Sequence, residues 1–211
     1  MTLPRKSPPA RAPEIRRARV DDASEIARLF LVSSDGLAAY IWQRPALPGQ
    51  SLAEVGAARY ARTGTAFSFE NCLLATVGGA VAGMAHAFAM PPRAPGEVEE
   101  DPVLAPYAEL EDPGSLYLSG LAVDDRFRGR GIGGALMDRV EALAIETGCR
   151  CVSLICFEAN WRAMRFYRDR GYREIARRPL VPHPALRYGE GDAVLLVRAG
   201  RTVAGHGEPR S

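Results

Sequence analysis

The stretch that decides the fold is DDRFRGRGIGGALMDRVEALA, residues 124–144. It holds four glycines within six positions (Gly129, Gly131, Gly133 and Gly134), and an amphipathic helical pattern follows them at once. The apolar run SLYLSGLAV, residues 115–123, comes directly before it and has the composition of a β-strand. A strand, a glycine-rich turn and a helix are therefore expected in this order.

The glycine-rich turn is suited to binding an anion. The first N–H groups of a helix have no partner within the helix, and the helix dipole adds partial positive charge there. Glycines let the backbone approach a ligand closely. Arg126, Arg128 and Arg130 can add charge-assisted contacts to phosphate oxygens. We expect a phosphate-bearing ligand, with a turn used only for tight packing as the alternative.

A dinucleotide site is one candidate for this turn. Gly129, Gly131 and Gly134 satisfy the G-x-G-x-x-G pattern, and Glu158 ends the next predicted strand, where a ribose-binding acid would lie. Two features oppose this candidate. The polar residues DDRFR separate the strand from the first glycine, and the downstream sequence holds too few alternating strands and helices to complete a Rossmann fold.

Two motifs support a different family. The segment LAVDDRFRGRGIGGALM, residues 121–137, resembles the acyl-CoA-binding motif of the GCN5-related N-acetyltransferases, the GNAT superfamily, with Arg128, Gly131 and Gly133 in R-x-x-G-x-G spacing. The segment NWRAMRFYRDRGYREI, residues 160–175, resembles the next motif of that family. The resemblance implies that the glycine-rich turn binds the pyrophosphate of coenzyme A.

The resemblance also implies an α/β fold (α+β, with a mixed sheet), in which helices flank a central mixed β-sheet. The sequence agrees with it over residues 15–198. A strand and a helix are predicted within residues 14–34, and a helix at about 51–62. A hairpin is predicted over 71–90, turning at Gly78 and Gly79. Downstream, strands are predicted at 151–157, 172–181 and 192–198, with a helix over 160–171.

A long acidic insertion interrupts this succession of predicted strands and helices before the strand at 115–123. Residues 91–115 contain six prolines and seven acids against the single Arg93. A loop of this length inside a compact domain is usually functional or disordered. The predicted organisation is a basic, proline-rich tail at residues 1–13, one catalytic domain at 14–199 and a C-terminal tail at 200–211.

The resemblance assigns roles to individual residues. Backbone N–H groups would cradle the pyrophosphate, and those of the preceding strand would pair with the pantetheine arm. The strand would separate from its neighbour to leave a cleft, and the N–H of Leu121 would stabilise the oxyanion. Asn160 would bind the pantetheine, and Tyr167 would protonate the departing thiolate as general acid. The backbone positions concerned are Leu121, Ala122, Val123, Arg128, Gly129, Arg130, Gly131, Ile132, Gly133 and Gly134.

The general base stays open. Many relatives carry a glutamate in the strand before the glycine loop, whereas residues 116–123 contain no acid. The candidates from other segments are His86, Glu109, Glu111, Glu158 and His183, or a base that acts through ordered water. For His86, within an apolar strand, a structural role is the default expectation.

Bulk composition restricts the remaining options. The net charge of +2 is too small to predict a nucleic-acid partner, and no apolar run approaches the ~20 residues that span a bilayer. The four cysteines suggest neither a disulfide framework nor a metal site, and the N-terminal region lacks the apolar core of a secretory signal. These features predict a cytoplasmic protein without a metal. The family resemblance adds a possible homodimer.

The sequence therefore predicts an acetyl-CoA-dependent N-acetyltransferase. The acceptor would be a small-molecule amine, and the acid-rich insertion favours a cationic one. By the resemblance, the amine attacks the thioester directly within a ternary complex. Two alternatives remain: a GNAT-like module that binds acyl-CoA as a sensor without turnover, and an NAD-binding oxidoreductase.

Overall fold

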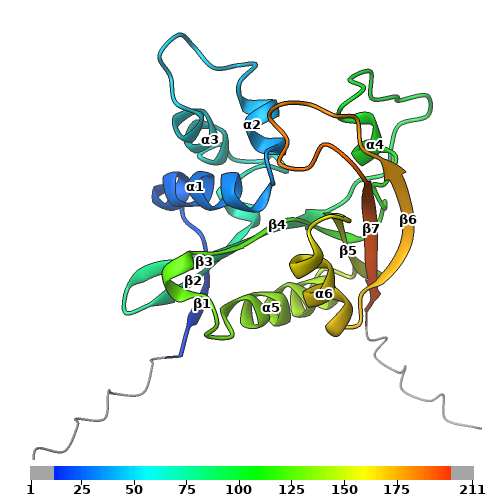
Figure 1. Ribbon diagram of the computed structural model, residues 1–211. Coiled ribbons are helices and arrows are strands. Elements are labelled where there is room, and N and C mark those ends of the chain that lie inside the picture. The colour runs from blue at the N-terminus through cyan, green and yellow to red at the C-terminus, as the bar shows by residue number, and fades with distance from the viewer. Residues whose placement is uncertain (1–11, 201–211) are drawn as a thin grey trace, which may run out of the picture.

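The computed structural model describes residues 12–200 and has a seven-stranded sheet at its centre (Figure 1). The strands lie in the order β1-β2-β3-β4-β5-β7-β6. Only β4 and β5 pair in parallel; the other neighbours are antiparallel. The predicted mixed sheet is confirmed. The strands are β1 (Glu14–Arg17), β2 (Cys72–Val77), β3 (Ala80–Ala89), β4 (Leu116–Val123), β5 (Cys151–Phe157), β6 (Arg173–Pro179) and β7 (Asp192–Ala199).

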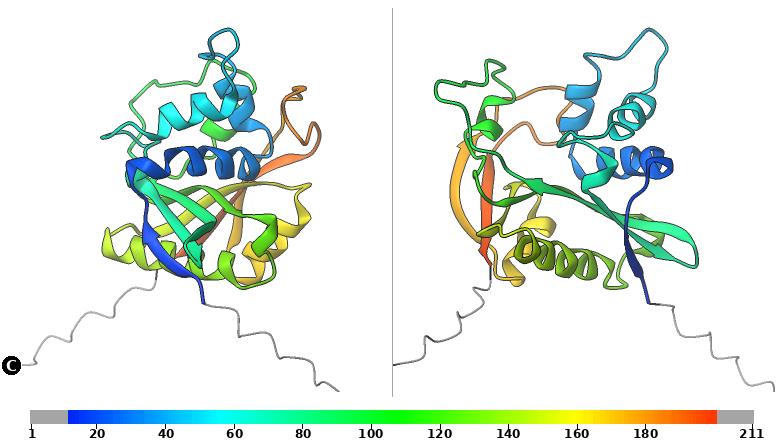
Figure 2. Two further views of the ribbon diagram at one scale, coloured as in Figure 1. Left: turned by 90° about the vertical axis from the view of Figure 1, so that its left-hand side faces the viewer. Right: turned by 180° about the vertical axis from the view of Figure 1, so that it is seen from behind.

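Helices cover both faces of the sheet. One face carries α1 (Ala23–Ser33), α2 (Leu37–Trp42) and α3 (Leu52–Tyr60), and the opposite face carries α5 (Ile132–Glu146) and α6 (Trp161–Asp169) (Figures 1 and 2). The short α4 (Ala105–Ala108) lies within the acidic insertion. The predicted tails, residues 1–13 and 200–211, fall almost wholly outside the described residues.

Each face of the sheet has its own core. On one face, Leu136 and Val140 of α5 pack against Leu118 of β4, and all three are buried. On the other face, Ile26 of α1 packs with Met84 of β3. This two-sided burial follows from the alternation of side chains along each strand. The glycine turn is thereby held between a buried strand and a buried helix.

The sequence analysis did not predict the two short helices α2 and α4. The residues of α2 contain Ala38, Tyr40 and Trp42 in a run of only six, too short for a clear helical period. The four residues of α4 lie in a proline-rich segment that was predicted as a loop. The helix expected at 51–62 is present as α3 and begins with a capping box between Ser51 and Glu54.

Arginines pair with four of the seven acids of the acidic insertion. These four acids form ion pairs with side chains of distant segments and with Arg93 of the insertion itself. This pairing weakens the insertion as a reason to expect a cationic acceptor, because these four carboxylates already have counter-charges. The pairs are Asp101 with Arg44, Glu109 with Arg178, Glu111 with Arg93, and Asp112 with Arg150.

Candidate active site

The site lies where β4 and β5 separate. Their parallel pairing consists of Leu116 with Val152 and Tyr117 with Ser153, and no further pair follows along either strand. A cavity of about 1000 Å³ occupies the widening gap, lined by residues of β4, β5, α1, α2 and the loop before α6. The separation exposes one edge of β4 to the cavity.

A bulge in β4 marks the start of this open edge. His86 of β3 pairs with Gly120 and Ala87 pairs with Leu118, so Ser119 is an extra residue in β4. A β-bulge kinks its strand and increases the local twist. The kink lies just beyond the last β4–β5 pair, which accounts for the divergence of the two strands.

The backbone of β4 turns selected polar groups toward the cavity. Asp124 donates its N–H to the carbonyl of Ala82 in β3, at 2.9 Å. Because backbone groups alternate sides along an antiparallel strand, those of Leu121 and Val123 face away from β3. Both residues line the cavity. The backbone groups of Ala122 face β3, so its predicted contact with pantetheine has no free donor or acceptor.

The glycine turn presents free N–H groups at the start of α5. Gly131 is the N-cap residue, with φ +75°, and no side chain caps the helix. An L side chain rarely adopts this left-handed conformation, whereas glycine does so at little cost. Ile132 buries its side chain in the core, so only its backbone can serve a ligand. Gly129 and Gly133 line the cavity, whereas Gly131, Ile132 and Gly134 lie beside it.

The arginines of the turn differ in their surroundings. Arg128 lines the cavity and forms an exposed ion pair with Asp125 at 2.7 Å. Arg130 contacts only a backbone carbonyl and an aromatic ring, so its charge is not compensated by a described acid. Arg126 forms an ion pair with Asp124, and hydrogen bonds from Arg126 hold the pKa of that carboxyl far below its usual range.

The two predicted side chains of the second motif both line the cavity. Asn160 caps α6 by accepting a hydrogen bond from the N–H of Ala163. Tyr167 is 8% exposed, and the described residues offer its hydroxyl no hydrogen-bond partner. Burial raises the pKa of Tyr167 above its usual value, so the hydroxyl keeps its proton at neutral pH. A protonated hydroxyl is the state that a general acid requires.

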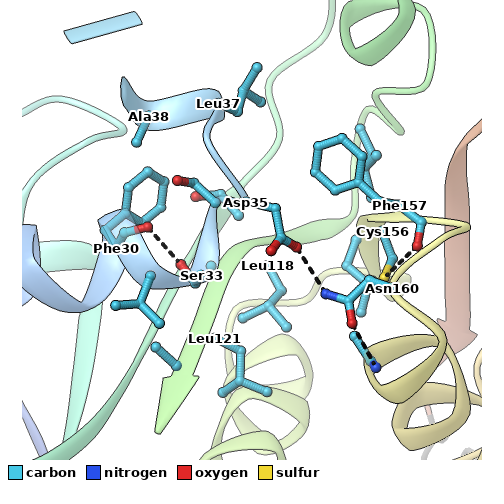
Figure 3. Close-up of a pocket in the computed structure, with 18 of the residues that line it drawn as sticks. Phe30, Ser33, Asp35, Leu37, Ala38, Leu118, Leu121, Cys156, Phe157 and Asn160 are labelled. Carbon is cyan, nitrogen blue, oxygen red and sulfur yellow. Dashed lines mark hydrogen bonds between the residues drawn. The ribbon is translucent and has the colours of Figure 1, made fainter. Parts of the chain in front are cut away.

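Asp35 is a site residue that the sequence analysis missed. It lies between α1 and α2, lines the cavity and is 9% exposed. Its carboxylate accepts a hydrogen bond of 2.9 Å from the side-chain amide of Asn160, across the cavity and above Leu118 (Figure 3). Its backbone has φ +46°, a conformation that costs free energy in a residue other than glycine and is often found at functional sites.

Burial raises the pKa of Asp35, although the Asn160 amide and the cationic Arg187, 3.6 Å away, act in the opposite direction. The charge of Asp35 in turn adds to the burial that raises the pKa of Tyr167 and of Cys156. All three side chains line the same cavity. A carboxylate with a raised pKa in a cleft is a candidate acid or base.

The structure places most of the five candidate bases from the sequence away from the cavity lining. Only Glu111 is among the residues that line the cavity, and it pairs with Arg93 at 3.1 Å. Glu109 and Glu158 form ion pairs with arginines at the surface. His183 packs edge-on against Tyr40, is half-buried and does not line the cavity.

His86 is fully buried behind the bulge. Its Nε2–H donates to the carbonyl of Ala66 at 2.9 Å, so Nδ1 accepts, and Ser119 donates to it at 2.7 Å. Burial lowers the pKa of His86 to about 4. The imidazole is therefore neutral, with both nitrogens hydrogen-bonded, as a structural histidine would be.

Cys156 also lines the cavity, but burial raises the pKa of its thiol to about 12. The thiolate is the nucleophilic form of cysteine, so this side chain is not an acceptor of the acyl group at neutral pH. Within residues 12–200, His, Cys, Asp and Glu side chains form no group of three that could hold a metal. No helix in the same range is long and apolar enough to cross a bilayer.

Comparisons with known proteins agree with this geometry. The model of the acetyltransferase (GNAT) family matches residues 37–172. GCN5-related N-acetyltransferase 4, chloroplastic, of Arabidopsis thaliana is 42% identical over 62 residues, 29% of this chain and 21% of that protein. Thialysine N-epsilon-acetyltransferase of Bos taurus is 31% identical over 61 residues, 29% of this chain and 36% of that protein. The matched segments thus span about a fifth and about a third of these relatives.

Solved structures share the fold at low identity. An acetyltransferase structure superimposes with a TM-score of 0.64 at 20% identity, covering 89% of this chain and 100% of that one. The ribosomal-protein-S18-alanine N-acetyltransferase from Escherichia coli gives 0.53 at 18% identity, covering 94% and 99%.

The fold combines a mixed sheet with helices on both faces and an open β4 edge, which defines a mixed α/β class of proteins. The family model matches more than half of the chain, which shows that this chain belongs to the acetyltransferase (GNAT) family. The NAD-dependent alternative is wrong, because a dinucleotide fold needs a mostly parallel sheet and the described sheet has one parallel pair.

Burial of neutral His86 predicts a pH-dependent stability. The pKa is about 4 in the folded protein and about 6.5 in the unfolded chain, so the unfolded state binds a proton first as the pH falls. The free energy of unfolding should decrease by about 3 kcal/mol from pH 7 to pH 4 through this residue. Urea titrations across this range measure it for the wild type and His86→Gln. Carboxylates titrate in both proteins, so parallel curves would contradict the prediction.

Proposed function

We propose that the protein transfers an acetyl group from acetyl-CoA to the amino group of a small molecule, by direct attack within a ternary complex. The observation that carries this proposal is the open edge of β4. Leu121 and Val123 line a cavity of about 1000 Å³ with backbone groups that β5 does not pair. An extended amide-containing chain such as pantetheine can pair with such an edge as a further strand does.

The glycine turn supports the coenzyme part of the proposal. The free N–H groups at the start of α5, a helix of 15 residues, form an anion site. Arg128 and Arg130 add positive charge beside it. Gly129 and Gly133 connect this anion site to the cavity. A ligand with a pyrophosphate at one end and an acyl thioester at the other matches this layout.

The acetyl transfer requires the protein to stabilise an oxyanion, to donate one proton and to accept another. The amine nitrogen forms a bond to the thioester carbon, and the carbon–sulfur bond breaks. In the proposed mechanism the N–H of Leu121 donates to the oxygen on which negative charge develops. Tyr167 gives its proton to the leaving sulfur, and the proton lost by the amine goes to a base.

We assign the role of base to Asp35. It is a carboxylate of the cavity lining, and its charge acts on Tyr167, the proposed acid. Its partners are the neutral amide of Asn160 and the more distant Arg187, so the charge is only partly compensated. The same carboxylate would attract an ammonium group and then accept its proton. Asp35 thus replaces the strand glutamate that residues 116–123 lack.

The names of the relatives include both a small acceptor and a protein acceptor. The bovine relative is named for the acetylation of thialysine at its ε-amine. The Escherichia coli structure is named for the acetylation of a protein alanine. Residues of α1, α2 and α6 line the cavity, and its volume of about 1000 Å³ is that of a small-molecule site, which favours a small molecule over a folded protein surface.

Gly131→Glu should abolish acetyl-CoA binding, because the carboxylate would stand at the anion site with its negative charge. Calorimetric titration with acetyl-CoA measures the affinity, with NAD as the control ligand. Gly148→Glu is the matched control. Gly148 follows the other end of α5 with φ +70°, and like Gly131 it has open space around its Cβ position. Wild-type affinity in Gly131→Glu would refute the assignment of the turn.

Tyr167→Phe should lower kcat about 10²- to 10⁴-fold with little change in acetyl-CoA affinity, because only proton donation to sulfur is lost. Release of CoA measures kcat, and calorimetry measures the affinity. Equal losses in both quantities would assign Tyr167 to packing instead.

Asp35→Asn should lower kcat/KM by a similar factor and remove the rise of kcat/KM with pH that ionisation of Asp35 produces. Asparagine tolerates the left-handed backbone at this position and still accepts the Asn160 hydrogen bond, so the fold should persist. Glu111→Gln, at the cavity's other carboxylate, is the control and should keep the pH dependence. An unchanged pH profile in Asp35→Asn would exclude it as base.

The same measurements separate the enzyme from a sensor. If acetyl-CoA binds tightly and none of the tested amines causes release of CoA, the protein is a non-catalytic module.

A further inference from the structure

Arg59 is a cation of the cavity lining that the proposed mechanism does not use. It lies on α3, and its guanidinium stacks over the ring of Phe67, with 4.6 Å from Cζ to the ring centroid. Its Nε atom is buried and has no hydrogen-bond partner. Stacking holds the guanidinium in place, but the donor at Nε remains unsatisfied.

No described acid compensates this charge. None of the ion pairs within residues 12–200 includes Arg59. Burial, followed by the nearby charge of Arg62, lowers the pKa of Arg59 below its usual value. Arg59 is half-buried, and a buried donor such as its Nε is costly without a partner. An unsatisfied donor and an unpaired charge beside a cavity are suited to an anion carried by a bound ligand.

The anion is not expected to be part of the coenzyme. Arg59 lies on α3, whereas the anion site of the glycine turn is at the start of α5, and these helices cover opposite faces of the sheet (Figure 2). On its own side, Arg59 adjoins a run of aromatic rings. Phe67 contacts Phe88, with ring centroids 5.7 Å apart, and Phe88 contacts Tyr117 at the same distance. All three rings line the cavity.

From this arrangement we infer that Arg59 binds a carboxylate carried by the amine acceptor, which makes the acceptor an amino acid or a close derivative. The inference rests on the proposed function and narrows its substrate class. A planar guanidinium with adjacent N–H donors matches a carboxylate, and its single charge balances a monoanion. The aromatic run beside it accommodates an apolar side chain of the same acceptor.

A binding experiment tests the carboxylate site without turnover. Propionate, hexanoate and 3-phenylpropionate are each titrated against the matching primary amide by calorimetry, on the wild type and on Arg59→Met. A charge-assisted contact should make at least one acid bind about 10- to 100-fold more tightly than its amide. Arg59→Met should remove this difference. Methionine keeps an apolar contact with Phe67, and thermal unfolding checks that the variant is folded.

Arg62→Met is the matched control, because Arg62 is exposed and lies about one turn further along the chain without lining the cavity. It should retain the preference for acids. No difference between acids and amides in the wild type, or a difference that survives in Arg59→Met, would overturn the inference. A loss of acetyl-CoA affinity in Arg59→Met would also overturn it, since Arg59 would then belong to the coenzyme site.

A turnover experiment tests whether the carboxylate belongs to the acceptor. CoA release is compared for amino acids and their amides, beginning with phenylalanine and phenylalaninamide. The amino acids should have at least a 10-fold higher kcat/KM, and Arg59→Met should abolish this preference. Equal rates, or no release from any amino acid, would refute the acceptor assignment. Failure of acetyl-CoA to bind the wild type would refute the proposed function instead, while the acid and amide titrations would still report on Arg59.

Discussion

The separation of β4 from β5 is the constraint on which the rest of the structure depends. A buried strand edge without partners is costly, because each N–H and C=O group needs a hydrogen bond. Here the edge is left open along a cavity of about 1000 Å³, and the bulge at Ser119 directs it away from β5. The fold retains this cost only because the layers on both faces hold β4 in place. The cores around it therefore hold the open edge in place, as the proposed pairing with an extended ligand requires.

The fold was predictable because its signals are local. The strand, turn and helix around Gly131, the hairpin at Gly78 and the buried β5 each have a pattern that a short window reveals. The two short helices α2 and α4 were missed because one or two turns give no usable period, and tertiary packing stabilises them. The pairing of Asp101, Glu109 and Asp112 with arginines could not be predicted for a related reason, since these three partners are distant in sequence.

The residues of the candidate site also fall into two groups, those that local sequence patterns predict and those that they do not. Gly131, Asn160 and Tyr167 belong to contiguous motifs, so their positions could be predicted from the sequence. Asp35 and Arg59 could not, because the burial of Asp35 and the unsatisfied Nε of Arg59 are properties of the folded chain. The one sequence hint for Asp35 is its place in the turn SSDG, where Asp before Gly tolerates a left-handed backbone. That hint predicts a turn and says nothing of a cavity.

On the proposed assignments, the two missed residues also explain how the cavity would select its acceptor. Asp35 and Arg59 each carry a charge that its surroundings compensate incompletely or not at all. An amine without a carboxylate would pair only with Asp35, and an acid without an amine would pair only with Arg59. A molecule that carries both groups relieves both, so the discrimination comes from what the wrong ligand leaves unpaired. On these assignments, the specificity of the cavity comes from the pairing of both charges by one acceptor.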